Sequence, residues 1–340
     1  MELSMGQNVI TNDFSWSKSR HEKFSGCRRA YFLHYYGSWG GWENGASEEA
    51  RQLFTLKRLA NRFNWAGNVV HAHIRDVLRN IQAERAVDGE AVLRRAHQLM
   101  QRDWLYSRSK SYWDEGKRRP DFTGLVEHEY DEPVSREEWQ RNWQTVEQGL
   151  KWFLASPWIE RARALKSHQW LEVDEGAQKS NFDMQGVKVF AIPDFVFRDE
   201  SGHVTVVDWK TGKMREGYED QVVGYALYLA HRYRVPPESV RCLLVFVNQA
   251  EEVEVRVDAA TVARYRVFFE ESVRSMQALL LNAAQNVPVE ATQFPKTDDL
   301  RECARCAFRR ACGRQNVTFA ALGAEAANAP LPEQRAASAA

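Results

Sequence analysis

The sequence predicts an α/β fold, with a central mixed sheet, helices on both sides of the sheet and a helical insert. The first half of the chain has mostly helical periodicity. β-branched and aromatic runs of strand length then follow at 169–173, 187–197, 204–210 and 240–247. A helical segment at 218–233 separates the last two runs. The order strand, helix, strand is typical of a crossover unit that covers one face of a mixed sheet.

The first helix is predicted near the N-terminus. The Ser15–Ser19 stretch supplies several candidate N-caps, and Ser19 with Glu22 fits a capping box. Apolar and aromatic positions at spacings of three and four then continue from Phe24 to Tyr35, and Cys27 is one of them. We therefore expect one continuous helix that carries this cysteine.

A second helix is predicted at about 66–86, with an apolar stripe along it. His71 and His73 flank that stripe about 160° apart, so only one of them can face a given site. Periodicity alone does not choose between them. Two further helical patterns follow: 90–108, and 135–166 with an interruption at Pro157.

A β-hairpin is predicted around the turn-forming Asp-Glu-Ser-Gly sequence at 199–202. A loop centred there places Asp194 and Asp208 opposite each other, where Cβ atoms lie roughly 4.5–5.5 Å apart. Strand alternation puts Lys210 on the same face as Asp208. Two carboxylates that can share a divalent cation, with an ammonium group beside them, suit the cleavage of phosphodiesters.

Asp208 and Lys210 have an alternative role as an exposed salt bridge on an edge strand. The strand at 204–210 is too apolar for this, because buried charges must be paired or bound. Glu172, in the strand before the hairpin, is a further candidate for an acidic ligand.

The C-terminal part begins with an edge strand at 253–257 and a long amphipathic helix at 259–286. Three cysteines follow within 287–316. We expect one domain over 1–316, with the helical insert at about 87–165. The Ala-rich tail at 317–340 is expected to be disordered.

Four motifs resemble those of a known group in order and content. They are Gly67-x-x-x-His71, Pro193-Asp194, Asp208-Trp209-Lys210-Thr211-Gly212 and Gln221-x-x-x-Tyr225. The chain resembles the PD-(D/E)XK nuclease superfamily, and within it the RecB-like branch. The resemblance runs from Ser15 to Arg314 and implies a restriction-endonuclease-like sheet, with 87–165 as an unmatched insert.

The resemblance implies roles for individual residues. Asp194 and Asp208 would be ligands of Mg²⁺ or Mn²⁺, and His71 a third ligand. Lys210 would orient or deprotonate the attacking water and offset charge on the phosphate. Gln221 and Tyr225 share one helix face and, by the resemblance, lie beside the site and contact the scissile strand. The predicted catalytic residues are therefore Asp194, Asp208, Lys210, Gln221 and Tyr225.

Five cysteines without a secretory signal are better suited to metal or cluster ligation than to disulfides. Cys303, Cys306 and Cys312 form a compact group that needs a fourth ligand, and Cys27 is the natural donor. This arrangement resembles the iron–sulfur staple of AddB-type helicase-nucleases and CRISPR-associated adaptation nucleases, which implies a [4Fe–4S] cluster. Zinc is the alternative. Cys242 is expected to be an inert core thiol.

Charge and hydropathy restrict the partners. The 46 basic and 46 acidic residues cancel, so contacts with nucleic acid must come from local patches. We expect no membrane span, no secretory signal and a cytoplasmic location. No P-loop is present, so the chain has no helicase motor of that type. Two basic patches are possible DNA contacts: Arg301, Arg305, Arg309, Arg310 and Arg314; and Arg51, Lys57, Arg58 and Arg62 ahead of Phe63 and Trp65.

The predicted function is a divalent-metal-dependent DNA nuclease, an exonuclease on single-stranded DNA in repair, recombination or defence. A helicase or a defence-system protein is an expected partner. The alternative is a non-cleaving nucleic-acid-binding subunit stabilised by an iron–sulfur cluster. A redox protein that uses the cluster for electron transfer is a third hypothesis, and it gives Asp208 no role.

Overall fold

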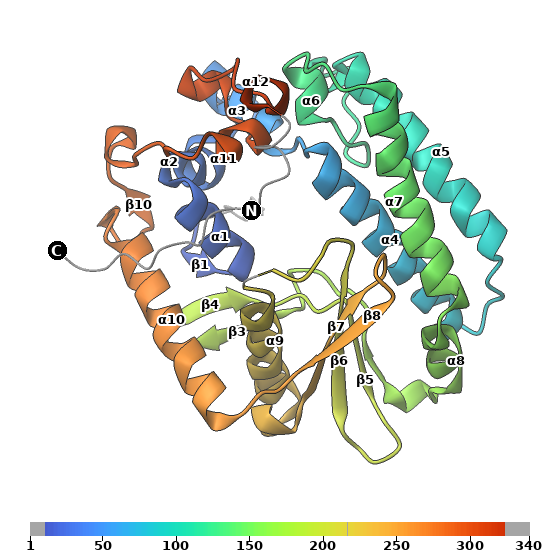
Figure 1. Ribbon diagram of the computed structural model, residues 1–340. Coiled ribbons are helices and arrows are strands. Elements are labelled where there is room, and N and C mark those ends of the chain that lie inside the picture. Colours follow the sequence, from blue (N-terminus) through green and yellow to red (C-terminus); the bar gives the residue numbers. More distant parts are fainter. Residues whose placement is uncertain (1–10, 216, 324–340) are drawn as a thin grey trace, which may run out of the picture.

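The computed structural model describes residues 11–215 and 217–323. A five-stranded mixed sheet lies at its centre (Figure 1). Its strands in spatial order are β2 (Trp170–Glu172), β5 (Phe195–Arg198), β6 (Val204–Lys210), β7 (Arg241–Phe246) and β8 (Glu251–Val255). The β6–β7 pair is parallel and is joined through α9 (Tyr218–Tyr233), whereas the other neighbouring pairs are antiparallel. The predicted mixed sheet and crossover unit are confirmed.

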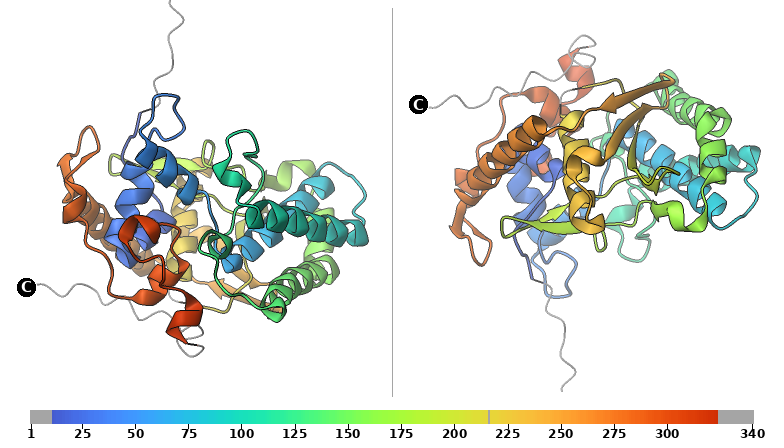
Figure 2. Two further views of the ribbon diagram at one scale, coloured as in Figure 1. Left: turned by 90° about the horizontal axis from the view of Figure 1, so that it is seen from above. Right: turned by 90° about the horizontal axis from the view of Figure 1, so that it is seen from below.

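Helices cover both faces of this sheet (Figure 2). On one face, Val206 and Leu244 pack with residues of α9 and α10 (Ala259–Gln277). On the other face, Val207 and Val245 pack against a second set of helices. That set comprises α4 (Arg62–Gln82), α5 (Gly89–Arg108), α7 (Arg136–Ala155) and α8 (Pro157–Ala164). The α/β class with helices on both sides is therefore confirmed, and Pro157 begins α8, where its missing N–H costs nothing.

The single strand predicted at 187–197 is wrong. Its first part, β4 (Val187–Phe190), pairs with β1 (Ser15–Trp16) and β3 (Asn181–Met184) in a separate three-stranded sheet. Its last part belongs to β5 in the central sheet. The chain changes sheet at 191–194, where Pro193 has no N–H to donate to a ladder.

The N-terminal helix is also not continuous. It is divided into α1 (Lys18–Gly26), α2 (Arg28–Phe32) and a π-helical turn (Leu33–Gly37). Cys27 adopts an extended conformation (φ −161°, ψ 109°), and its Sγ accepts a hydrogen bond from the Ala30 N–H at 3.4 Å. The cysteine thus begins a new helix. The cap of α1 is Ser17 and not Ser19, because the Ser17 hydroxyl accepts from the Arg20 N–H.

The C-terminal part departs from the prediction in three places. Helix α10 ends at Gln277; β9 (Leu280–Asn282) lies within the rest of the predicted helix and pairs with β10 (Val287–Pro288) just beyond it. The edge strand β8 begins two residues before the predicted strand. Helix α12 (Phe319–Leu322) lies inside the predicted disordered tail, and Phe319 is buried. Residues 324–340 lie outside the described residues.

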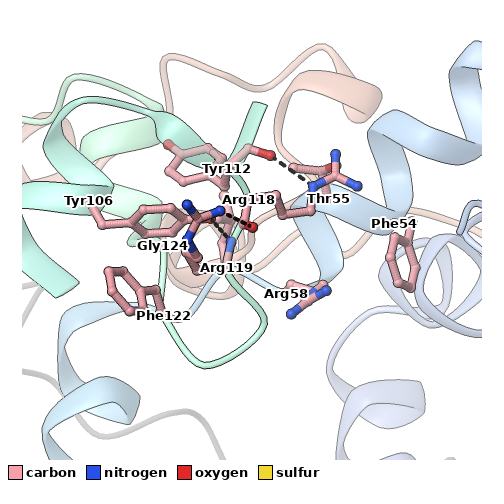
Figure 3. Close-up of a pocket in the computed structure, with 10 residues that line it drawn as sticks. Phe54, Thr55, Arg58, Tyr106, Tyr112, Arg118, Arg119, Phe122 and Gly124 are labelled. Atoms are coloured by element: carbon pink, nitrogen blue, oxygen red, sulfur yellow. Dashed lines mark hydrogen bonds between the residues drawn. The ribbon is translucent and has the colours of Figure 1, made fainter. Parts of the chain in front are cut away.

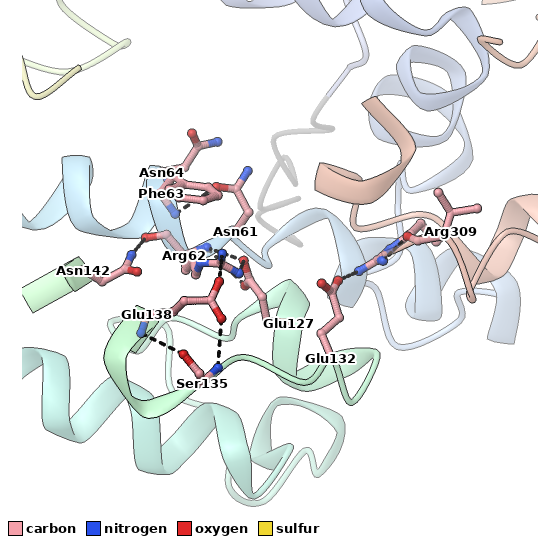
Figure 4. A network of polar contacts seen from close by, with 11 residues as sticks. Asn61, Arg62, Phe63, Asn64, Glu127, Glu132, Ser135, Glu138, Asn142 and Arg309 are labelled. Carbon is pink, nitrogen blue, oxygen red and sulfur yellow. Dashed lines mark hydrogen bonds and ion pairs between the residues drawn. The ribbon is translucent and has the colours of Figure 1, made fainter. Parts of the chain in front are cut away.

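A third, small apolar cluster joins the helical insert to the cysteine segment. It packs residues of α2, α3 (Glu48–Lys57) and α6 (Val126–Glu129) against Phe308. Arg309 links the two parts: its guanidinium forms an ion pair with Glu132 (Figure 4). The guanidinium also lies 4.1 Å from the Tyr130 ring centre. Both side chains of the ion pair are buried. In residues 11–215 and 217–323, no helix is long and apolar enough to cross a membrane.

Glu127 makes the stability of the protein depend on pH. It is buried and accepts hydrogen bonds from the Arg62 N–H at the start of α4, at 2.9 and 3.1 Å (Figure 4). Burial raises its pKa from 4.5 to about 7, against the opposing effect of Arg62. Since the folded protein binds this proton more tightly than the unfolded chain, the free energy of unfolding falls as pH rises from about 4.5 to about 7.

We therefore expect Glu127→Gln, which keeps an acceptor for the Arg62 N–H, to remove this pH dependence. Between pH 4.5 and pH 8, the difference in free energy of unfolding between variant and parent should shift by about 2–3 kcal/mol in favour of the variant. Urea unfolding of both proteins across this range measures it. A difference between the two that does not change with pH contradicts the prediction.

Candidate active site

The β5–β6 hairpin sets the distance between the two carboxylates. Phe195 pairs with Val207 in the antiparallel register, and one further step of this register places Asp194 opposite Asp208. The Trp209 N–H donates to Asp194 Oδ2 at 2.8 Å, which fixes the orientation of that carboxylate against β6. The facing arrangement of the two aspartates is the one that the turn position predicts.

Lys210 lies on the same face of β6 as Asp208. Its Nζ is 2.5 Å from Asp208 Oδ2, and both residues are buried. Lys210 Nζ also donates to Gln221 Oε1 at 2.8 Å. The Gln221 amide donates to the Tyr225 hydroxyl at 2.7 Å, and both Gln221 and Tyr225 lie 3.4 Å from Asp208 Oδ1. Helix α9 thus holds the lysine and the second aspartate in place.

His71 reaches the site from α4. Its Nδ1 lies 3.1 Å from Asp194 Oδ1. His73 is buried and donates to the Val69 carbonyl within the same helix. Helix α4 approaches the loop after β6 closely, since a Cβ on Gly67 would lie only 3.3 Å from Thr211 Oγ1. The glycine of the first motif therefore permits the contact that brings His71 to Asp194.

The four charged groups control one another's protonation. Burial raises the pKa of Asp208, and the neighbouring charge of Asp194 raises it further, against the effect of Lys210. Burial also raises the pKa of Asp194, but His71 and the Trp209 N–H reverse the direction and lower it. The pKa values of His71 and Lys210 are both raised, because the carboxylates outweigh the effect of burial. Positive charge is therefore favoured between the two aspartates.

The donor set fits a hard divalent cation through its carboxylates. Asp208 Oδ2 is buried, and its contact is the Lys210 ammonium, a cation in the place where a metal ion would be bound. Carboxylate oxygens are the ligands that Mg²⁺ and Mn²⁺ prefer. However, within 11–215 and 217–323 no three His, Cys, Asp or Glu side chains are arranged as a group that could hold a metal ion. The role of His71 as a third ligand stays a prediction.

Glu172 is used elsewhere. Its Oε1 accepts hydrogen bonds from the hydroxyls of Tyr228 and Tyr233, at 2.8 and 3.0 Å. Arg232 forms an ion pair with the same oxygen at 2.9 Å. These contacts compensate the buried charge, so the guess that Glu172 adds a ligand to the site has no support in its surroundings.

Tyr218 is a site residue that the sequence analysis missed. Lys210 Nζ lies 4.3 Å from its ring centre, so the ring supports the lysine from the α9 side. A signal was present: Tyr218, Gln221 and Tyr225 follow one another at spacings of three and four and thus share a helix face.

The predicted cluster ligands are drawn together by the fold. Cys27 lies near enough to Cys306 and Cys312 to raise their pKa values, although burial is the larger cause; the pKa of Cys306 is about 12. Cys303 accepts a hydrogen bond from Arg314 at 3.1 Å, and Cys306 from the Phe308 N–H at 3.3 Å. In the described part of the chain these cysteines do not form a recognisable metal-binding group.

Cys242 lies apart, in β7. It is fully buried in the core between the sheet and α9, and its thiol donates to the Val222 carbonyl at 3.7 Å. Burial raises its pKa to about 12. These properties are those of the inert core thiol that the sequence analysis expects.

A separate small hollow lies between α3, the end of α5 and the loop after it (Figure 3). Arginines and aromatic rings line it, Arg118 and Tyr106 among them. It contains none of the predicted catalytic or ligand residues. The hollow is therefore distinct from the candidate active site.

The comparisons with known proteins agree with this geometry. A family model described as the PD-(D/E)XK nuclease superfamily matches residues 15–313. No curated protein matches the sequence significantly. The match spans α1 to the cysteine segment and includes Asp194, Asp208 and Lys210, which the hairpin brings together. By its sequence over most of its length and by its central mixed sheet, the chain belongs to the PD-(D/E)XK nuclease superfamily.

Proposed function

We propose that the protein is a divalent-metal-dependent DNA nuclease. The observation that supports this most directly is the grouping of Asp194, Asp208 and Lys210 at the end of β6, with Lys210 buried in an ion pair. A buried ion pair of this kind is often no more stable than apolar residues in its place, so its presence favours a functional role for the group. The chemistry of this trio is that of phosphodiester hydrolysis.

In the proposed mechanism, Asp194 and Asp208 would hold Mg²⁺ or Mn²⁺, with His71 as a third ligand. When bound, the ion would make water more acidic and offset negative charge on the phosphate. Lys210 orients the attacking water and offsets negative charge that develops on the phosphoryl oxygens. Gln221 and Tyr225 are positioning residues here, because they contact Lys210 and Asp208 and thereby hold them.

The finer activity that we propose is exonuclease action on single-stranded DNA in the cytoplasm, in repair, recombination or defence. A helicase or a defence-system protein would supply the strand. Unpaired DNA is favoured by exposed aromatic and basic side chains near the site, such as Phe63 and Arg215. The competing hypothesis is a non-cleaving DNA-binding subunit.

Degradation of end-labelled single- and double-stranded oligonucleotides with Mg²⁺ or Mn²⁺ tests the proposal. We expect the single-stranded label to appear first in short products, and chelation with EDTA to stop the reaction. Intact substrate in every condition, together with retained binding, supports the non-cleaving subunit instead. Protein purified without oxygen is needed, since a cluster would be sensitive to it.

We further propose a [4Fe–4S] cluster held by Cys27, Cys303, Cys306 and Cys312. Support comes from N–H groups that donate to sulfur: Ala30 to Cys27, Phe308 to Cys306 and Arg314 to Cys303. Such hydrogen bonds accompany cysteine thiolates that bind iron–sulfur clusters. A buried thiol such as Cys306 needs a cation to ionise, and the cluster iron would provide it.

Anaerobically purified protein should therefore show an absorbance band near about 400 nm, typical of cysteine-ligated clusters. Cys27→Ser should lose the band and lower the unfolding temperature, whereas Cys242→Ser should keep the band. Colourless protein with one bound zinc per chain would show that the site holds zinc and not an iron–sulfur cluster.

A further inference from the structure

Phe63 is half exposed (50%) although it is a large aromatic side chain at the start of α4. Residues four apart follow one side of a helix, so Phe63, Gly67 and His71 form a stripe. Gly67 faces Thr211 and His71 contacts Asp194, so this stripe leads to the candidate active site. At 1.5 Å per residue, Phe63 and His71 are about 12 Å apart along the helix axis.

The C-terminal segment supports one edge of Phe63. The Phe319 ring meets it edge to face, with ring centres 6.1 Å apart, and Phe319 itself is only 6% exposed. Arg305, the last residue of α11 (Leu300–Arg305), lies 5.6 Å from the Phe319 ring centre. Figure 4 shows Phe63 on the side of the helix start away from Glu127 and Glu138. The exposed part of the ring is therefore available to a flat ligand.

Two arginines, Arg215 and Arg305, lie close enough to each other for their charges to interact. Arg215 lies 4.8 Å from the Tyr218 ring centre, and Lys210 of the candidate site lies over the same ring. Burial lowers the pKa of Arg305; Glu302 opposes this change, and the neighbouring charge of Arg215 adds to it. Within 11–215 and 217–323, neither Arg215 nor Arg305 forms an ion pair or a side-chain hydrogen bond. An anion between them would relieve this repulsion.

We propose that Phe63 stacks on an unpaired base and that Arg215 and Arg305 bind a backbone phosphate of the same strand, next to Lys210. An exposed ring can stack only on a base that is free of a duplex, so the site takes single-stranded nucleic acid. The inference rests on the proposed nuclease function for the fate of the strand. Binding itself requires no cleavage, which allows the two to be tested separately.

Phe63→Ala tests the stacking contact, and Phe63→Trp is its conservative partner. Fluorescence anisotropy with a labelled single-stranded oligonucleotide, in buffer without divalent metal, gives the dissociation constant. We expect Phe63→Ala to weaken binding about 5- to 150-fold, and Phe63→Trp to restore it. An oligonucleotide with 2-aminopurine should lose its fluorescence quenching in the alanine variant alone.

Leu105→Ala is the matched control, because Leu105 is 64% exposed on α5 and its loss should leave binding unchanged. Equal affinity of the parent and Phe63→Ala for the single strand overturns the stacking contact. Strand binding that depends on Phe63 without any cleavage would leave this inference intact and refute the nuclease function. If Phe63→Ala cleaves and binds the strand as well as the parent does, the nuclease function is supported and the stacking contact is refuted.

The arginine pair has an independent readout in salt dependence. Removing a phosphate contact from a single-stranded complex lowers the slope of log K against log salt by about 0.7. The double variant Arg215→Gln with Arg305→Gln should show this change, whereas Phe63→Ala should keep the parent slope. Arg256→Gln, an exposed arginine on the β8–α10 loop, is the control. An unchanged slope in the double variant overturns the phosphate contact.

Discussion

Lys210→Ala is expected to lower the rate of DNA cleavage about 10²–10⁴-fold, the range for losing a positioned proton-transfer or charge-stabilising group. The variant also removes the ion pair of Asp208, whose pKa is already raised by burial. Without the ammonium the pKa of Asp208 rises further, so Asp208 is less readily ionised to hold Mg²⁺ or Mn²⁺. Both effects act on cleavage and not on the distant contacts with the strand.

Single-turnover cleavage of a labelled single strand at saturating Mn²⁺ measures the loss. Lys213→Ala is the matched control, since Lys213 is an exposed lysine of the same loop region, three residues further on. Binding to the strand without metal should be preserved in both variants. A Lys210→Ala protein that cleaves within tenfold of the parent would remove this lysine from the mechanism.

The second large effect is expected at Arg309. Arg309→Met leaves Glu132 buried without its partner, and breaking a buried ion pair in this way costs about 3–5 kcal/mol of stability. It also removes the contact of the guanidinium with the Tyr130 ring. The double variant Arg309→Met with Glu132→Gln removes both charges and should recover most of the loss.

Denaturant unfolding of the four proteins gives the coupling between the two residues. A coupling near zero would show that the ion pair does not join the insert to the cysteine segment. Because Arg309 lies between Cys306 and Cys312, the single variant should also lose the proposed cluster more easily, which the absorbance band would report.

The sequence predicts the hairpin and its consequences well. Turn chemistry at 199–202 and strand alternation suffice to place Asp194 opposite Asp208 and Lys210 beside it, and these are local rules. The crossover through α9 follows equally from the order of elements. The approach of α4 depends on a tertiary contact, so the family spacing and not the periodicity selects His71 over His73.

Three predictions of secondary structure are wrong, and the local rules of sequence do not reveal why. Cys27 interrupts a helix whose apolar spacing continues through it, because its thiol caps the next helix; spacing alone does not show such a cap. The switch between sheets at Pro193 was hidden in a run of strand-forming residues. The β9–β10 hairpin replaced a helix end for which no strong stop signal is present. Each miss involves a backbone contact that only the folded chain provides.

The N-terminal helices find their partners at the other end of the chain. Trp16 donates to Ser272 Oγ, Arg29 donates to the Phe294 carbonyl, and Asn286 donates to the Asn12 carbonyl. A ribosome makes residue 29 long before residue 294, so these contacts form only after residue 294 has emerged. Until then the nascent protein exposes its N-terminal elements, and the core that they complete should be acquired only after that point.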